Sequence, residues 1–491
     1  MFEELKNLSK HSLVYMLGSI AGRMVGFIMI PVYTRYLTPA DYGVLELVSL
    51  TIDIIGMFAA LGINTAITRF YYDYKEQKER DEVITTALLS TILLAAIPTV
   101  ILIFEADWLS TLVFGEATYS YYFQLLLASN YLDLVVIVPM TVLTIREKST
   151  TYVIFSMIRL ALSLGLNIYF VVILEYGIVG ILYSSLISIA VNCLALSLII
   201  FGKMRIRFRL AKAWKMVRFG APLVVAALGT FVLNFADRYF LEHFGTLGMV
   251  GLYSIGYKFA IAMSELLHKP FILMWNVFMF KIADRPDAKQ MYARVMTYNS
   301  FVVVFCALAM SVLIKDVLRI MVTPEFFDAH KVVPFILSGF YFYYMMPILD
   351  VGIMLTKKTY LRAINVTTAA VVNLALNYFL ISKFQMMGAA YATLLSYAFL
   401  AVMTLVVSGR VFRVPYEYFR LAKLFASALL VFAISRVIEI DSLILSIVVK
   451  LGIVLIFPLL LVPMRFYDEK ERRKVSEIWG QLIHKVRRES N

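Results

Sequence analysis

Long apolar runs recur from one end of this chain to the other. Of its 491 residues, 61% are hydrophobic and only 16% are charged, whereas a typical soluble domain has about 45–50% apolar and about 25% charged residues. A run of about 20 apolar residues can cross a bilayer as a helix, and fourteen runs here approach or exceed that length. The runs are continuous and do not alternate as the strands of a membrane barrel do. We therefore predict an all-α, polytopic membrane protein.

Short loops separate the fourteen predicted transmembrane helices, and no loop is long enough to hold a soluble domain. The predicted spans are residues 11–32, 43–66, 83–104, 119–143, 152–173, 178–201, 217–241, 249–278, 297–314, 332–355, 360–381, 388–408, 421–437 and 443–463. The longest polar stretch is 465–491, where apolar residues recur at helical spacing among lysines and arginines. That pattern predicts an amphipathic helix, which either lies on the membrane surface or packs on the loops beside it.

The lysines and arginines are distributed unevenly between the two sides of the membrane. Of 46 such residues, thirty-four lie in the two tails or in, or within three residues of, even-numbered loops, and six lie in, or within three residues of, odd-numbered loops. Basic residues are enriched on the cytoplasmic side of membrane proteins. We therefore expect both termini to be cytoplasmic, which agrees with an even number of spans. The net charge of +13 is then a feature of membrane topology and of attraction to anionic lipid, and we expect no nucleic-acid partner.

The two halves of the chain repeat each other at a constant offset of 208 residues. The matched pairs are Thr38 and Thr246, Gly43 and Gly251, Pro139 and Pro347, Thr151-Tyr152 and Thr359-Tyr360, Gly180 and Gly388, Tyr183 and Tyr391, and Leu186-Ser188 and Leu394-Ser396. Each repeat holds six predicted spans, an even number, so both copies face the same way. Parallel repeats of this kind are related by an axis along the membrane normal and enclose a cleft at their interface.

This repeat predicts four parts of the chain. Residues 1–210 and 211–415 are expected to form two parallel six-helix lobes. Residues 416–464 add two helices outside the repeat, and residues 465–491 form the amphipathic tail on the cytoplasmic side. We expect alternating access by rocking of one lobe against the other, as in transporters built from such repeats.

Charged side chains inside apolar spans indicate function, because burying a charge in a membrane is unfavourable. In the first twelve spans the deepest basic residues are Arg23, Arg159, Arg238 and Lys258. A cleft with a positive field concentrates anionic substrates, and the arginine fork matches phosphate oxygens. We predict that these four residues bind an anionic substrate, although Arg238 could instead pair with its neighbour or reach the interface.

Three acidic residues in the spans are candidate sites for a coupling ion: Asp53, Asp237 and Glu265. Structural roles are also open for them, because buried ion pairs often hold helices together. Asp53 could neutralise Arg23, and Glu265 could neutralise Lys258. We expect Lys450 to make a packing or lipid contact, since its span lies outside the repeat, and the tyrosines at 253, 257, 341, 343 and 344 to pack in the core or stack on sugars.

Enzyme signatures are absent from the sequence. It has no phosphate-binding GxxxxGK[ST] loop, no HExxH and no CxxC motif. Cys193 and Cys306 both lie in apolar spans and indicate no disulfide or metal framework. We expect a protein that is not an enzyme and has no metal or cofactor. Without a nucleotide-binding domain, transport would draw on an H⁺ or Na⁺ gradient or run downhill.

Four segments resemble the polysaccharide flippases of the multidrug/oligosaccharidyl-lipid/polysaccharide exporter superfamily. They are residues 33–50 (YTRYLTPADYGVLELVSL), residues 60–74 (ALGINTAITRFYYDY), residues 218–259, and the pair 176–188 (YGIVGILYSSLIS) and 386–398 (MMGAAYATLLSYA). The resemblance covers the whole chain. It implies a V-shaped, two-lobed carrier of a bacterial or archaeal cytoplasmic membrane that moves undecaprenyl-diphosphate-linked oligosaccharides to the outer leaflet. Arg23 and the Asp237-Arg238 pair resemble the family's cavity charges.

Two alternatives remain beside this interpretation. The lipid II flippase branch also has fourteen spans and an arginine in the first span. A polytopic polysaccharide polymerase or ligase of the same pathway belongs to a different class, but it typically needs a larger external loop than the one at 315–331. Expected partners are the lipid-linked glycan, membrane lipids, the coupling ion and other polysaccharide-assembly membrane proteins.

Overall fold

The computed structural model describes residues 25–471 apart from residues 203, 439 and 470. Every regular element in this part of the chain is a helix, so the predicted all-α class is confirmed. Two predictions fall outside the described residues: the position of Arg23 and the amphipathic helix of the C-terminal tail.

The first half of the described chain holds five long helices and four short ones. Its elements are α2 (Ile30–Tyr36), α3 (Pro39–Ala60), α4 (Ile63–Tyr71), α5 (Gln77–Phe104), α6 (Ala106–Phe114), α7 (Ser120–Ile145), α8 (Ser149–Asn167), η1 (Ile168–Ile173) and α9 (Gly177–Phe201). The predicted second span is formed by α3 and α4 together, and the predicted fifth span by α8 and the π-helix η1.

The second half follows the same order and adds two helices at its end. Its elements are α10 (Leu210–Phe235), α11 (Asp237–Phe244), α12 (Leu247–Met263), η2 (Ser264–His268), α13 (Lys269–Lys281), α14 (Ala288–Met321), η3 (Pro324–Lys331), α15 (Val333–Leu349), α16 (Val351–Leu355), α17 (Thr359–Val411), α18 (Tyr418–Val437) and α19 (Leu443–Leu460).

Twelve helical segments within the described residues are long and apolar enough to cross a membrane. They lie at the predicted spans from the second onward. One of them, α17, is two helices joined at Gln385, whose φ of 50° and ψ of −125° are not helical. It therefore accounts for the predicted eleventh and twelfth spans. Most of the predicted first span precedes the described residues, so the total of fourteen remains a prediction.

The break between α3 and α4 has a local cause. Leu61 and Gly62 both take left-handed backbone conformations, with φ of 44° and 65°. A Cβ atom at Gly62 would come within 2.6 Å of the Gly220 carbonyl oxygen on α10. Glycine is therefore required here both for the left-handed turn and for the close approach of α10.

The internal repeat is visible in the way equivalent helices begin. Thr38 and Thr246 both cap the helices that follow them, accepting hydrogen bonds from the amides of Asp41 at 3.2 Å and Met249 at 3.3 Å. Such caps satisfy amide groups that the first helical turn leaves unpaired. Pro139 and Pro347 also occupy equivalent places, inside α7 and α15.

At one turn the offset between the repeats is 210 residues. The Lys148 amide donates to the Leu143 carbonyl, and the Lys358 amide donates in the same way to Ile353. Thr151 and Thr359 are therefore two residues out of structural register. The helix before the second turn is interrupted at Asp350, between α15 and α16, and the two additional residues lie in this interval between Pro347 and Ile353.

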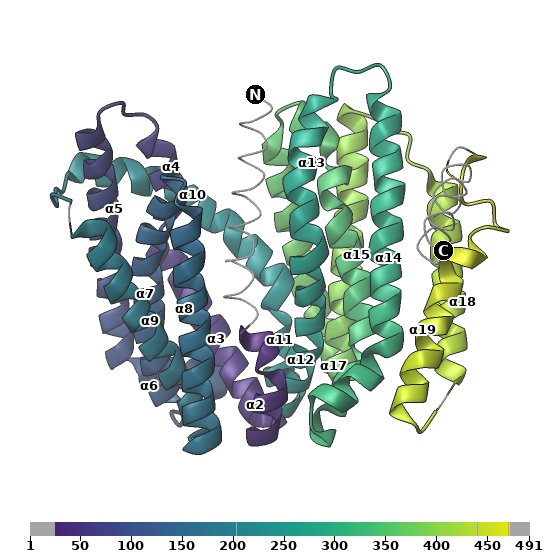
Figure 1. Cartoon of the computed structure of the whole chain (residues 1–491), viewed down its shortest axis with the longest axis horizontal. Helices are drawn as coiled ribbons and strands as arrows, with labels where there is room; N and C mark the ends of the chain where they lie inside the picture. The colour runs from purple at the N-terminus through teal and green to yellow at the C-terminus, as the bar shows by residue number, and fades with distance from the viewer. Residues whose placement is uncertain (1–24, 203, 439, 470, 472–491) are drawn as a thin grey trace, which may run out of the picture.

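The helices form two groups that meet at one end of the molecule. In the first group, α5, α7, α8 and α9 pack on one another; in the second, α12, α14, α15 and α17 do so. Figure 1 shows the groups leaning together at the end that holds α2, α3, α11 and α12, and apart at the opposite end. Helix α10 connects them, because it contacts α4 and α5 of the first group and α17 of the second.

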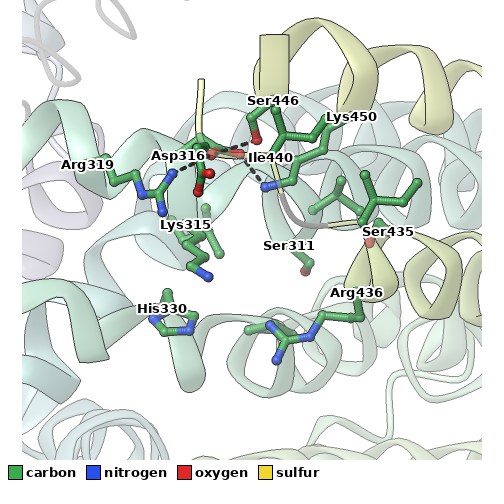
Figure 2. Close-up of a pocket in the computed structure, with 15 residues that line it drawn as sticks. Ser311, Lys315, Asp316, Arg319, His330, Ser435, Arg436, Ile440, Ser446 and Lys450 are labelled. Atoms are coloured by element: carbon green, nitrogen blue, oxygen red, sulfur yellow. Dashed lines mark hydrogen bonds and ion pairs between the residues drawn. The ribbon is translucent and has the colours of Figure 1, made fainter. Parts of the chain in front are cut away.

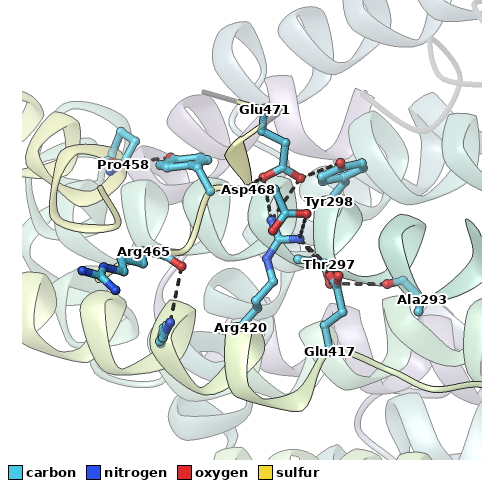
Figure 3. A network of polar contacts seen from close by, with 11 residues as sticks. Ala293, Thr297, Tyr298, Glu417, Arg420, Pro458, Arg465, Asp468 and Glu471 are labelled. Carbon is cyan, nitrogen blue, oxygen red and sulfur yellow. Dashed lines mark hydrogen bonds and ion pairs between the residues drawn. The ribbon is translucent and has the colours of Figure 1, made fainter. Parts of the chain in front are cut away.

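Helices α18 and α19 pack on the outside of the second group, against α14. A polar cluster holds them there (Figure 3). Arg420 at the start of α18 binds Glu417 at 3.0 Å and Glu471, beyond α19, at 2.8 Å. Tyr298 of α14 donates to Glu471 at 2.6 Å, and Thr297 donates to Glu417.

Glu471 has a perturbed acidity in this cluster. Burial opposes its ionisation, but hydrogen bonds from Tyr298, the Asp468 amide and Arg420, together with the charge of Arg420, outweigh burial and lower the pKa of the Glu471 carboxyl below its ordinary value. The ionised form of Glu471 is therefore the one that attaches the segment beyond α19 to α14 and α18.

Candidate functional site

The two groups of helices meet backbone to backbone at α3 and α12. A Cβ atom at Gly43 would overlap the carbonyl oxygen of Leu247, and one at Gly251 would overlap the carbonyl oxygen of Pro39. The two contacts are related by the 208-residue offset of the repeat. The pseudo-symmetry axis of the two lobes therefore passes between these helices, and only glycine allows them to approach so closely.

Other contacts between the two groups surround this glycine pair. The Thr51 hydroxyl lies 2.9 Å from the Tyr239 hydroxyl, and Thr323 donates to the Thr34 carbonyl at 2.8 Å. The rings of Phe27 and Phe259 meet edge to face at 5.4 Å. We call the contacts of α2 and α3 with α11, α12, α14 and the segment before η3 the lobe junction. It lies toward the side that the charge distribution predicts to be external.

Lys258, which the sequence predicted to bind an anionic substrate, lies at the lobe junction. Its ammonium group donates to the Tyr42 hydroxyl at 2.6 Å and lies 4.7 Å from the centre of that ring. A Cβ atom at Gly26 would come within 4.0 Å of the same ammonium. Glu46, one turn along α3 from Tyr42, is close enough for its charge to act on Lys258. Lys258 therefore connects the two lobes through a neutral hydroxyl.

Asp237 and Arg238 lie in the interior of the second lobe, where their side chains are 3% and 1% exposed. They pair at 2.7 Å, and Arg238 also donates to the Asn234 carbonyl at 2.6 Å. The guanidinium lies 4.0 Å from the ring centre of Tyr257 and 4.9 Å from that of Tyr253. Such cation–π contacts stabilise a desolvated cation by about 2 kcal/mol.

Further hydrogen bonds join this buried pair to three helices. The second oxygen of Asp237 accepts from Tyr253 at 2.6 Å and from Thr393 at 3.2 Å. The side-chain oxygen of Asn234 accepts from Tyr257 at 3.2 Å and from Tyr397 at 2.7 Å. The resulting cluster connects the α10–α11 break with α12 and α17. We refer to Asn234, Asp237, Arg238 and these partners as the buried cluster.

The first lobe holds a separate, more accessible group of charges. Arg159 of α8 pairs with Asp133 of α7 at 2.7 Å, and their side chains are 36% and 37% exposed. Asp53 of α3 is exposed and lies within electrostatic range of Asp133 and Glu46. This group is one cation among several carboxylates, so it does not by itself supply the positive field that the sequence predicted for the cleft.

Glu265 takes a partner other than the predicted one. Its carboxylate pairs with Lys269 one turn later on the same helical segment, and Lys258 instead contacts Tyr42. Four residues thus gather at or near the lobe junction: Lys258, Glu46, Asp237 and Arg238, since the charge of Glu46 also acts on Arg238. Arg159 belongs to the first-lobe group, and Arg23 lies outside the described residues.

Several residues of the site were missed in the sequence. Glu46 is an acid inside an apolar span, and the argument that selected Asp53 applies equally to it. Asn234 and Tyr42 carry no charge and gave no comparable signal. Tyr253 and Tyr257 were expected to pack in the core or to stack on sugars; both are buried. Within the described residues, no three His, Cys, Asp or Glu side chains are grouped as metal ligands.

Comparisons with known proteins agree with this architecture. The family described as "Polysaccharide biosynthesis protein" matches residues 8–272. The Haemophilus influenzae (strain ATCC 51907 / DSM 11121 / KW20 / Rd) "Lsg locus putative protein 1" is 21% identical over 266 residues, which are 52% of this chain and 62% of that protein. The chain therefore aligns with less than two thirds of that relative's length.

Two solved structures share the fold. The lipid II flippase MurJ in an inward closed conformation superposes with a TM-score of 0.74 at 14% identity, covering 93% of this chain and 100% of that one. An inward-facing multidrug resistance MATE family transporter of the MOP superfamily gives 0.65 at 14% identity, covering 79% and 94%. The predicted MATE-like architecture of two parallel bundles is thereby confirmed.

Proposed function

This chain belongs to the polysaccharide biosynthesis protein family, and from that membership we propose that it is a flippase of the MOP superfamily. Its substrate would be an undecaprenyl-diphosphate-linked oligosaccharide, moved from the cytoplasmic to the outer leaflet by alternating access. The moving parts would be residues 1–210 and 211–415. The location would be a bacterial or archaeal cytoplasmic membrane, with both termini cytoplasmic and with other polysaccharide-assembly membrane proteins as partners.

One observation carries this proposal: the two groups of helices meet through a tight but small lobe junction at one end and lean apart at the other, where helix α10 bridges them (Figure 1). A carrier that rocks between two states needs a contact that closes one side and can separate. The junction consists of glycine backbone contacts, single hydroxyl hydrogen bonds and an aromatic edge. None of these is a network of buried ion pairs between lobes, so separation would leave few charges without a partner.

Lys258 is the best-placed of the proposed substrate residues. It lies between the lobes, and its present partner is a neutral hydroxyl. A diphosphate would offer a stronger, charge-assisted acceptor. Arg23, which lies outside the described residues, would be a further cationic contact for the substrate. Arg159 would contribute after exchanging Asp133 for the substrate, whereas Arg238 would act mainly by holding α11 and α12 in position.

The coupling ion would act at Asp237. Its carboxylate accepts hydrogen bonds from two hydroxyls besides pairing with Arg238, and such oxygen groups suit a proton or Na⁺. Protonation or ion binding would rearrange the bonds that tie α11 to α12 and α17, next to the lobe junction. Asp53, with Glu46 and Asp133 nearby, would be a second site, and Glu265 a third.

Native mass spectrometry of the purified protein in mild detergent tests the proposal, with the wild type compared to Arg23→Gln and Lys258→Gln. We expect a co-purified polyprenyl-diphosphate oligosaccharide that both variants lose. Lys281→Gln, on α13 at the predicted cytoplasmic end, is the matched control and should retain it. The wild type is also supplied with a defined polyprenyl diphosphate. Failure of the wild type to bind this lipid would contradict the proposal.

A lipid II flippase is the second candidate, favoured by the likeness to the MurJ structure over 93% of the chain. The same spectra distinguish the two, because a peptide-bearing lipid has a different mass from a lipid-linked oligosaccharide. A polymerase or ligase would instead lengthen or transfer the glycan. Incubating the protein with a defined lipid-linked oligosaccharide and finding unchanged glycan mass would argue against that class.

A further inference from the structure

A polar cavity of about 160 Å³ lies where α14, η3, α18 and α19 converge, and its lining residues are different from those named at the lobe junction. At its floor a buried carboxylate has both an ion-pair partner and a hydrogen-bond partner. Lys450 of α19 pairs with Asp316 of α14 at 2.6 Å, and Ser446 donates to the same carboxylate at 3.0 Å. All three side chains are more than nine-tenths buried. This ion pair makes the packing contact expected of Lys450, and it neutralises the deepest charge of the cavity.

The walls of the cavity carry further positive groups. The cations Lys315, Arg319 and Arg436 line it together with the ring of His330, and Asp441 is the second acidic residue besides Asp316. Figure 2 shows Lys315, His330 and Arg436 on the side of the cavity away from Ser446 and Lys450. Arg319 approaches Asp316 only to 3.9 Å. Within the described residues, Arg436 makes no ion pair or hydrogen bond. Arg319 and Arg436 therefore place positive charge beside a neutralised floor.

The positive side chains that line the cavity affect the pKa of His330, which is the histidine among the lining residues. Burial lowers the pKa of His330, and the positive charges of Lys315, Arg436 and Lys331 lower it further, while its contact with the Phe327 carbonyl opposes the change. Groups from three different segments thus act on one ring. This is independent support for a positive field inside the cavity.

The location makes this concentration of charge unexpected. Only six lysines and arginines lie in or next to loops predicted to be external, and three of them, Lys315, Arg319 and Arg436, line this single cavity. Membrane topology alone depletes basic residues from this side and gives no reason to gather them. A ligand that requires positive charge accounts for the clustering.

Apolar side chains beside the cavity indicate where the ligand comes from. Val437, next to Arg436, is 83% exposed, and Ile444, two residues before Ser446, is 77% exposed. Both belong to the membrane-spanning segments α18 and α19 or their ends. Exposed apolar residues on such helices face lipid acyl chains. The cavity thus lies at the boundary between lipid tails and headgroups.

We propose that this cavity binds the phosphate group of an anionic membrane lipid, with the headgroup held by Arg319 and Arg436 and the acyl chains lying along α18 and α19. Basic pockets between transmembrane helices on the cytoplasmic side of membranes bind phosphate headgroups, and the same chemistry is available here on the opposite side. Paired guanidinium groups match phosphate oxygens in geometry as well as charge. The site is separate from the lobe junction and goes beyond the proposed transport function.

Lipid titration followed by native mass spectrometry tests the site. Dioleoyl phosphatidylglycerol or dioleoyl phosphatidylcholine is added to the delipidated full-length protein, and the dissociation constant of each bound lipid is measured. The test variant is Arg319→Gln/Arg436→Gln, which keeps the Asp316–Lys450 pair. The control, Arg35→Gln/Lys383→Gln, removes the same charge from other loops predicted to be external. Glu439, which lies outside the described residues, stays native in all variants.

We expect the tightest phosphatidylglycerol site to weaken about tenfold or more in the test variant, since charge-assisted hydrogen bonds are lost, and to be unchanged in the control. Thermal melting in phosphatidylcholine alone shows whether the test variant remains folded. Competition by inorganic pyrophosphate distinguishes a free phosphate from a lipid headgroup as the ligand. Displacement of the lipid means that phosphate itself is recognised, and no displacement means that the lipid tails are also needed. Equal phosphatidylglycerol affinity in both double variants, or equal wild-type affinity for the two lipids, would overturn the proposal.

Discussion

Replacing Gly251 by alanine should push the two lobes apart at the lobe junction. The new methyl group would overlap the Pro39 carbonyl oxygen and lie 3.0 Å from the carbonyl carbon and 3.1 Å from the Gly43 amide nitrogen. All three are backbone atoms, so no rotamer change relieves the clash. The strain exists only while α3 and α12 are in contact, and it disappears when the junction separates.

The size of the effect follows from the usual penalty of overpacking, about 1–3 kcal/mol. A penalty of this size on one of two states changes their ratio by about 5–150-fold. Alanine also favours a helix over glycine by roughly 0.5–1 kcal/mol, but that gain is shared by both states and cancels. Gly452→Ala is the matched control, because a Cβ atom there meets nothing within 4 Å.

The assay measures how often the junction opens. In a Cys193→Ser/Cys306→Ser background, Thr51→Cys places a thiol at a buried position facing Tyr239. A membrane-impermeant maleimide is added from the side predicted to be external. We expect the labelling rate to rise with Gly251→Ala and to stay unchanged with Gly452→Ala. Equal rates in the two variants would refute the idea that this glycine pair holds the junction closed.

Three further predictions concern other parts of the molecule. Asp316→Asn should destabilise the fold by about 3–5 kcal/mol, because it leaves the buried Lys450 ammonium without a counter-charge. Adding Lys450→Met should recover much of that loss. Thermal melting of both variants checks this prediction, and no recovery in the double variant would contradict it. The lowered pKa of Glu471 means that its stabilising contribution is present above its ordinary pKa of 4.5 and is lost as the pH falls through the lower folded-state value; hydrogen exchange of the segment around Asp468 should therefore show faster opening in acid, and Glu471→Gln should remove that pH dependence. Lys258→Gln should reduce transport more than tenfold while leaving protein abundance unchanged, as expected for loss of a charge-assisted contact; transport in reconstituted vesicles is the measurement, and Lys281→Gln should behave as the wild type.

The fold was predictable from the chain because its signals are strong and local. Continuous apolar runs leave no alternative to membrane helices, and the shared offset of Thr38 and Gly43 with Thr246 and Gly251 reveals the duplication. The same equivalences reappear as paired helix caps and as the symmetric contact between α3 and α12. These features depend on local backbone requirements, namely helix capping and close approach at glycine. Particular residue types meet these requirements, so the sequence reveals them directly.

The partners of the buried charges were not predictable in the same way. The sequence suggested that Glu265 could neutralise Lys258, yet the Glu265 carboxylate pairs with Lys269 and the Lys258 ammonium donates to Tyr42. Which side chain pairs with a buried charge depends on how two helices from different lobes approach each other. The sequence pattern describes one helix at a time and contains no information on that approach.

Composition, periodicity and charge asymmetry were thus enough to establish a helical membrane protein of two parallel repeats, since each of these properties is a sum over many residues or a local backbone requirement. The enclosure of Arg238 by Tyr253, Tyr257 and Asp237, and the gathering of Arg319 and Arg436 beside the Asp316–Lys450 pair, were decided only by tertiary packing. Side chains far apart in the chain become neighbours there, and their charge, burial and hydrogen bonds depend on distances that exist only once the helices are assembled.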